Sequence, residues 1–108
     1  SYSNQIKELL LGVKQSTLKK YGAVSEQVVK EMASGLIKKM KTDYGIAVSG
    51  IMGPGGGTPD KPVGTVWMAV ASAHKILTKK IFLRFDRHKN IEGTAKQVLY
   101  MAARFIEE

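Results

Sequence analysis

Apolar side chains recur along the chain at helical spacing in three places, and each place predicts a helix. The first would be capped by Ser3 and would run to about Val13, where apolar residues stand three and four positions apart. The second would open at Ser25 and keep an apolar face as far as Met40. The third would start at about Asn90 and continue to the end of the chain.

Three further runs have the composition of strands. Residues 44–49 are apolar without alternation, which predicts a strand buried on both faces. Residues 65–71 and 76–85 would be the next two, and the short turn at residues 72–75 predicts that they form a hairpin. Because a hairpin is antiparallel, this order of helices and strands predicts an α/β domain with a mixed sheet.

The segment between the first two predicted strands is the most informative one. Residues 49–65 hold six of the 11 glycines and all three prolines, and their central part, residues 51–64, is called the glycine loop below. Glycine lets backbone N–H groups approach a ligand, while proline restricts the chain, so the loop suits a phosphate or another anion. The pattern is neither a P-loop nor a dinucleotide fingerprint, since Thr58 stands where the latter needs glycine. A purely structural turn is the alternative.

Composition narrows the possible functions. With 108 residues the chain is one domain, and without cysteine it has neither disulfides nor a thiol nucleophile. The lack of cysteine agrees with a cytoplasmic protein, and no apolar run reaches membrane length, so no membrane partner is expected. The net charge of +8 suggests an anionic partner, but the lysines occur as short groups without interleaved aromatics. Nucleic acid is therefore not the expected partner.

Few residues offer catalytic chemistry. No metal site is expected, because His74 and His88 stand apart and no carboxylates have ligand spacing. Tyr2 and Lys7 are more interesting, since a buried lysine assisted by a phenol can deprotonate a serine and later protonate a leaving amine. Spacing alone favours the alternative, in which the lysine is exposed and the tyrosine is a packing residue.

Four segments together resemble a known family. They read YSNQIK at residues 2–7, LLGV at 10–13, YGAVSE at 21–26 and SGIMGPGGGTPDKPVGTV at 49–66. In this order they resemble signatures of the C-terminal domain of the CinA family of bacterial competence/damage-inducible proteins, which includes nicotinamide mononucleotide amidohydrolases. The resemblance covers essentially the whole chain and implies a three-layer α/β/α fold.

The resemblance also implies a reaction. Nicotinamide mononucleotide would be hydrolysed to nicotinic acid mononucleotide and ammonia in pyridine nucleotide recycling, without a metal or cofactor. Tyr2 and Lys7 would serve a serine nucleophile, and Arg84 or Arg87 would pair with the phosphate. The implied substrate-binding residues are Gly50, Gly53, Gly55, Gly56, Gly57, Thr58, Thr65 and Arg84. Association into a homo-oligomer is expected as well.

One departure limits this reading. The family's nucleophile lies in a Glu-Ser-Cys-Thr-Gly-Gly motif that precedes the tyrosine, and that motif does not occur in these 108 residues. Neither Ser3 nor Ser49 matches it. Residues 1–108 are therefore expected to be one amidohydrolase-type domain, incomplete at its N-terminus and inactive by itself. The alternatives are a non-catalytic nucleotide-binding module and a competence-related protein associated with nucleic acid.

Overall fold

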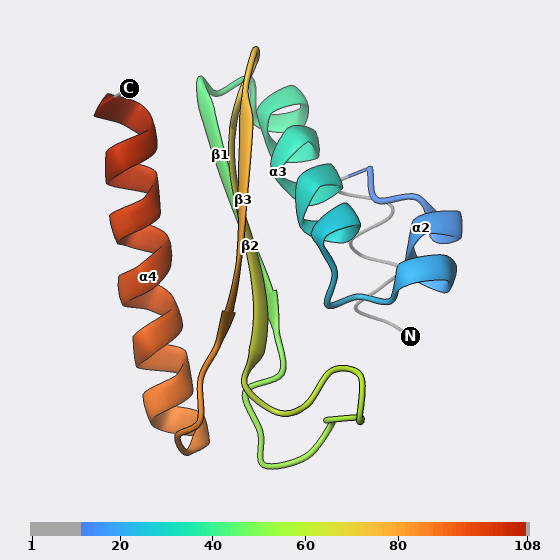
Figure 1. Ribbon diagram of the computed structural model, residues 1–108. Helices are drawn as coiled ribbons and strands as arrows, with labels where there is room; N and C mark the ends of the chain where they lie inside the picture. The colour runs from blue at the N-terminus through green and yellow to red at the C-terminus, as the bar shows by residue number, and fades with distance from the viewer. Residues whose placement is uncertain (1–11, 108) are drawn as a thin grey trace.

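The computed structural model describes residues 12–107 and has three layers (Figure 1). A sheet stands in the middle, the long helix α4 covers one face, and α3 with the short α2 lies on the other face. The elements are α2 (Gln15–Tyr21), α3 (Glu26–Met40), β1 (Tyr44–Gly50), β2 (Thr65–Ser72), β3 (Ile76–Phe82) and α4 (Arg87–Glu107). The predicted α/β/α arrangement is thus confirmed.

The sheet differs from the prediction in one respect. Its described strands are ordered β1-β2-β3 and both pairings are antiparallel, whereas we expected a mixed sheet. The reason is that the glycine loop returns the chain directly beside β1, with Gly50 opposite Val66, so no crossover places a strand in parallel. The hairpin between β2 and β3 is confirmed, with Ala71 opposite Ile76.

Small residues bring α3 close to the sheet. Ala47 of β1, together with Ala69 and Ala71 of β2, packs against Val29 and Ala33 of α3 in one buried cluster. At Gly45, a Cβ atom would lie 2.5 Å from the carbonyl oxygen of Ala33, which is too close for any side chain. These residues therefore fix the distance between α3 and the sheet.

Larger side chains fill the space under α4. Val66, Met68 and Val70 of β2 pack against Met101, Ala102 and Phe105 of α4. Strand β1 is less covered than predicted, because α4 lies mainly over β2. As a result Ile46, on the α4 side of β1, remains 39 % exposed, and the prediction of a strand buried on both faces is wrong for the described part of the chain.

The ends of several elements follow from local contacts. Helix α3 begins as predicted, since Ser25 Oγ accepts a hydrogen bond from the Val28 N–H at 3.3 Å. Helix α4 begins at Arg87 rather than at about Asn90, because Asp86 Oδ1 accepts from the Lys89 N–H at 2.9 Å. Strand β3 ends at Phe82, opposite the first residue of β2. The predicted first helix falls almost entirely on residues 1–11, outside the described residues.

Candidate functional site

The glycine loop is closed at its base by main-chain hydrogen bonds. The Ile51 N–H donates to the Thr65 carbonyl at 2.9 Å, and the Gly64 N–H donates to the Ile51 carbonyl at 2.6 Å. A second closure lies inside the loop, where the Thr58 N–H donates to the Lys61 carbonyl at 2.9 Å and the Lys61 N–H to Thr58 Oγ1 at 3.0 Å. Both closures restrict the loop, so it has a defined shape rather than that of a free linker.

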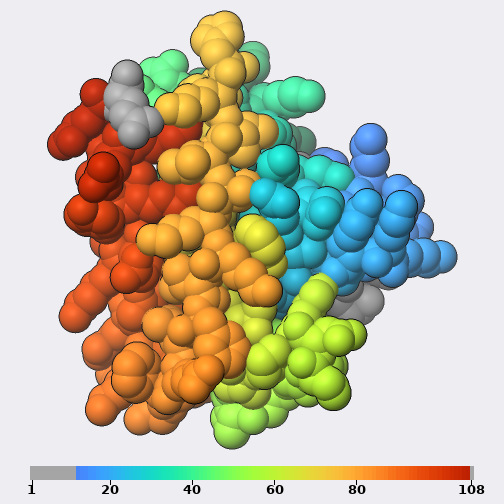
Figure 2. All heavy atoms as spheres, viewed as in Figure 1, coloured from blue at the N-terminus to red at the C-terminus, as the bar shows by residue number. Residues whose placement is uncertain are grey.

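Two neighbouring elements hold the loop from opposite sides. Lys61 Nζ donates to the carbonyl of Tyr21 at the end of α2. On the other side, Arg87 Nη1 at the start of α4 donates to the Gly53 carbonyl at 3.1 Å. Figure 2 shows the loop, in yellow-green, at the surface between the blue α2 region and the orange segment that leads into α4. The loop is therefore part of a surface built from three segments distant in sequence.

The middle of the loop presents unused donors. Within the part of the chain that the structure describes, the N–H groups of Gly55, Gly56 and Gly57 donate to no protein acceptor. All three glycines are exposed. Consecutive free N–H groups on an exposed turn can surround an anion, which is the chemistry that the sequence predicted for this segment.

A hollow of about 470 Å³ lies between the loop and the start of α4. This volume is within the ordinary range of small-molecule sites. Arg87 is the cation that lines it and also contacts the loop. A guanidinium has five N–H donors, and no described carboxylate pairs with Arg87, so it can bind an anion while it holds Gly53. The lining residues are Met52, Gly53, Pro54, Val63, Phe85, Asp86, Arg87 and His88.

The other predicted binding residues have different surroundings. Thr65 is 2 % exposed and its hydroxyl donates to the Pro62 carbonyl at 2.7 Å, so it supports the loop from within. Gly50 is the last residue of β1. The guanidinium of Arg84 lies 5.1 Å from the centroid of the Phe82 ring. The structure thus brings Arg87 to the loop, while Arg84 stacks on β3.

The predicted catalytic pair cannot be placed, because Tyr2 and Lys7 lie outside the described residues. Ser49, which lacked the nucleophile's motif, is 8 % exposed, and its hydroxyl donates to the Ala23 carbonyl at 2.8 Å. This bond ties the end of β1 to the turn between α2 and α3. The Ser49 hydroxyl thus serves to hold two segments of the fold together.

Sequence reasoning missed Asn90 as part of the site. Its side chain is fully buried at the start of α4, and Nδ2 donates to the Met52 carbonyl at 3.0 Å. A polar residue in the first turn of a predicted helix is an ordinary capping candidate. Nothing in the sequence pattern relates it to a loop 38 residues earlier.

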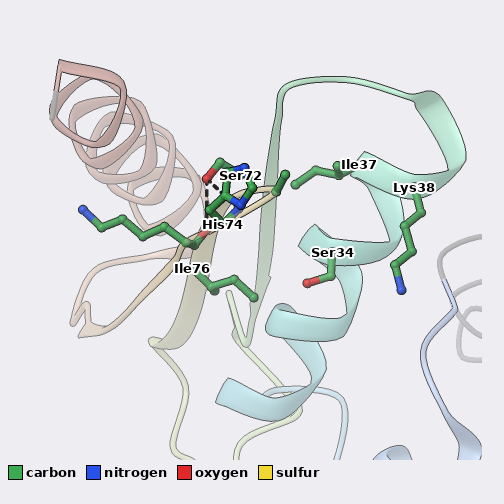
Figure 3. Close-up of a pocket in the computed structure, with 8 residues that line it drawn as sticks. Ser34, Ile37, Lys38, Ser72, His74 and Ile76 are labelled. Atoms are coloured by element: carbon green, nitrogen blue, oxygen red, sulfur yellow. Dashed lines mark hydrogen bonds between the residues drawn. The ribbon is translucent and has the colours of Figure 1, made fainter.

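A second hollow, of about 450 Å³, lies at the far end of the sheet, between α3 and the β2–β3 turn. In Figure 3, Ser34 and Ile37 point from α3 toward this turn, while Lys38 points away from it. The polar atoms at the turn bond to one another, with the Ser72 N–H donating to the Lys75 carbonyl at 2.7 Å. The glycine-loop side is the better candidate, because there an arginine contacts a loop that carries exposed N–H groups.

Residues 12–107 contain neither a cluster of metal ligands nor a membrane-spanning helix. No group of three or more histidine, aspartate or glutamate side chains lies close enough to hold a metal ion. No helix among these residues combines the length and apolar character needed to cross a bilayer.

The fold and the site define a class of protein. It is a three-layer α/β/α domain in which a glycine- and proline-rich loop, with free N–H groups, is held against the start of a helix. Comparison with known proteins then identifies the family. The sequence model of the CinA C-terminal domain family matches residues 1–106. The chain therefore belongs to this family, as the sequence motifs predicted.

Relatives and solved structures agree with this assignment. A putative competence-damage inducible protein of Thermoanaerobacter pseudethanolicus is 45 % identical over 106 residues, which are 98 % of this chain and 26 % of that protein. A CinA-like protein of Cytophaga hutchinsonii is 45 % identical over 108 residues, again with 26 % of its length covered. This chain thus spans about a quarter of the length of these curated relatives.

The solved structures are similar in fold at lower identity. The competence/damage inducible protein CihA from Agrobacterium tumefaciens superposes with a TM-score of 0.91 at 34 % identity, covering 96 % of this chain and 64 % of that one. A CinA superfamily protein from Escherichia coli superposes with a TM-score of 0.90 at 33 % identity. The superposition covers 94 % of this chain and 59 % of the Escherichia coli chain. These chains therefore share the fold described above.

Proposed function

We propose that this domain is the nucleotide-binding part of an amidohydrolase that converts nicotinamide mononucleotide and water to nicotinic acid mononucleotide and ammonia. The observation that carries the proposal is the contact of Arg87 with the Gly53 carbonyl, which ties a cation to the loop that also carries the exposed N–H groups of Gly55, Gly56 and Gly57. Resemblance of the motifs to the amidohydrolases of this family supplies the reaction. The mononucleotide's phosphate is the anion that would match such donors.

The chemical step would need groups beyond the described residues. A serine hydroxyl would attack the carboxamide carbon, ammonia would leave, and water would release the acid from the acyl-enzyme. Lys7, assisted by Tyr2, would take the serine proton and pass it to the leaving amine. Since these 108 residues contain no Glu-Ser-Cys-Thr-Gly-Gly motif, we expect the chain by itself to bind the nucleotide without hydrolysing it.

The experiment compares two arginines that stand three positions apart. Arg87→Ala should weaken binding of nicotinamide mononucleotide about 10- to 100-fold, because hydrogen bonds to a charged group are worth about 1.5–3 kcal/mol. Arg84→Ala is the matched control and should change affinity little, since Arg84 stacks on Phe82. Calorimetric titration measures both, with nicotinamide riboside as a ligand that lacks the phosphate and should not distinguish the variants.

Ammonia release gives the second readout. A longer protein that joins the family's serine motif to this chain should release ammonia from nicotinamide mononucleotide, and Lys7→Ala should abolish the release. The present chain should release none. Binding without ammonia release in either protein would favour the non-catalytic nucleotide-binding module. An effect of Arg84→Ala larger than that of Arg87→Ala would contradict the assigned site.

A further inference from the structure

Asn90 makes more polar contacts than a helix start requires. Its side chain is 0 % exposed, and Oδ1 accepts from the Phe85 N–H at 3.1 Å. One side-chain N–H donates to the Phe85 carbonyl at 3.0 Å and the other to the Met52 carbonyl at 3.0 Å. Both donors of the amide are therefore used, as is expected for a buried polar group.

The bond to Met52 is not explained by the needs of α4 itself. The first turn of the helix is already capped by Asp86, whose Oδ1 accepts from the Lys89 N–H at 2.9 Å. The two bonds to Phe85 stay within five residues of Asn90. Only the Met52 bond leaves this segment, and the carbonyl that it holds is immediately followed by Gly53 in the glycine loop.

Neighbouring side chains on the same face of α4 contact the same part of the loop. Arg87 donates to the Gly53 carbonyl, and Thr94 Oγ1 lies 3.8 Å from Met52 Sδ. Residues 87, 90 and 94 are three and four positions apart, the spacing of one helix face. The first two turns of α4 therefore form a rigid support for Met52 and Gly53.

We propose that Asn90 is a positioning residue for the nucleotide site, which holds the Met52 carbonyl and thereby sets the direction in which the loop leaves β1. This inference rests on the proposed function. The residues from Pro54 to Asp60 are exposed, so the loop depends on anchors at its two ends. Asn90 and Arg87 provide the anchor before Pro54, and Lys61 provides the one after Asp60.

The physical benefit is preorganisation. Ordering a residue's backbone costs roughly 1–2 kcal/mol, and a loop that is ordered before binding does not spend this from the binding free energy. With Met52 released, the N–H groups of Gly55, Gly56 and Gly57 would sample several directions. The site would keep all of its ligand-contacting groups and still bind more weakly.

The test is Asn90→Leu, which keeps the number and branching of the side-chain heavy atoms and removes all three bonds. In ¹H–¹⁵N spectra of the ligand-free chain, we expect the amide resonances of residues 53–57 to shift or broaden, while those of β2 and β3 do not. Affinity for nicotinamide mononucleotide should fall about two- to tenfold, the effect of one net hydrogen bond. In the longer, active protein, KM should rise more than kcat falls.

Phe105→Leu is the control for stability. Phe105 is buried at the other end of α4, so its substitution weakens the helix packing without touching the loop. Phe105→Leu should lower stability as Asn90→Leu does, but it should leave the nucleotide affinity and the loop resonances unchanged. This result would show that Asn90→Leu weakens binding because the loop loses its position, not because the fold is less stable. Equal losses of affinity in the two variants would overturn the inference.

A measurement on the unchanged protein covers the case in which Asn90→Leu does not fold. In the ligand-free chain, the Nδ2–H hydrogens of Asn90 should exchange slowly with solvent, because one is already bonded to the Met52 carbonyl of the loop and the other to the Phe85 carbonyl. Rapid exchange of these hydrogens before any ligand is added would overturn the inference. Failure of the wild-type chain to bind the nucleotide would reject the proposed function, whereas the ligand-free loop spectra would still decide whether Asn90 positions the loop.

Discussion

At the scale of single residues, the glycines of residues 49–65 differ in whether the fold requires glycine at their positions, and for what physical reason. At Gly64, φ is +98° and an added Cβ would lie 1.7 Å from the Leu83 carbonyl oxygen, so both conformation and space require glycine. At Gly57, an added Cβ would lie 2.7 Å from the Val63 nitrogen. At Gly55, an added Cβ would meet nothing within 4 Å. The protein's own packing thus explains Gly57 and Gly64 but not Gly55.

This contrast predicts opposite behaviour of two alanine substitutions. Gly64→Ala should destabilise the fold by roughly 3 kcal/mol or more, through backbone strain and the clash with Leu83. Gly55→Ala should change the free energy of unfolding by no more than about 0.5 kcal/mol. It should nevertheless weaken nucleotide binding, because the new methyl group would obstruct a ligand that approaches the loop N–H groups. Urea unfolding and calorimetric titration measure the two effects.

The result for Gly55→Ala separates the two interpretations of the loop. Unchanged affinity in this variant would favour the purely structural turn. A large loss of stability would instead mean that the loop packs differently around Gly55.

At the scale of elements, α3 was predictable and α2 was not. Helix α3 has a capping serine and an apolar face over its 15 residues, which are strong local signals. Helix α2 has seven residues, and only Thr17 among them is buried. Its support is tertiary, since Glu31 of α3 accepts from the Lys14 N–H at 2.7 Å and from the Thr17 hydroxyl at 2.6 Å. A helix this short does not form from propensity alone.

The end of α3 allows a prediction about stability. Lys41 follows the last helical residue in the left-handed conformation, with φ of 54° and ψ of 45°. Such a position favours glycine, because a side chain there is sterically strained. Lys41→Gly should therefore stabilise the protein by about 0.5–1 kcal/mol, after allowance for the larger entropy of the unfolded glycine variant.

Lys39→Gly is the matched control for this substitution. Lys39 is also an exposed lysine but lies within the last turn of α3, where glycine should cost up to about 1 kcal/mol. Thermal and urea unfolding of both variants measure the difference. Destabilisation by Lys41→Gly would show that the side chain of Lys41 contributes more than its backbone conformation costs.

At the scale of the whole molecule, charge and exposed apolar side chains act in opposite directions. The lysine groups lie on separate elements, with Lys19 and Lys20 in α2, Lys38 and Lys39 in α3, and Lys79 and Lys80 in β3. These three described pairs lie on three different elements, unlike the lysines of one helix or strand that follow a nucleic-acid backbone. Several large apolar side chains of α4 are exposed, among them Ile91, Leu99 and Ile106.

We expect the chain to associate with itself, and the association to depend on salt. Each copy carries a net charge of +8, so two copies repel each other at low ionic strength. Salt screens this repulsion and strengthens hydrophobic contact. Sedimentation velocity should therefore show a weight-average mass that rises with protein concentration, and more steeply at higher salt. A monomer under all of these conditions would contradict the expectation.

The sequence by itself determined the features that depend on near neighbours in the chain. The spacing of apolar residues indicated the long helices and the strands, and Ser25 marked the start of α3. The glycines and prolines of residues 49–65 marked the place of the glycine loop. The family also followed from motifs within single segments. These properties are local, because periodicity, capping and backbone freedom act over a few residues.

Only the tertiary structure decided which distant groups meet. The antiparallel return of β2, the choice of Arg87 over Arg84 as the loop's contact, and the bond from Asn90 to Met52 all join segments far apart in sequence. A hydrogen bond between residues 38 positions apart depends on how α4 packs across the sheet, and no local pattern records that packing. The place of the loop in the chain was therefore predictable, whereas the residues that hold it in position were not.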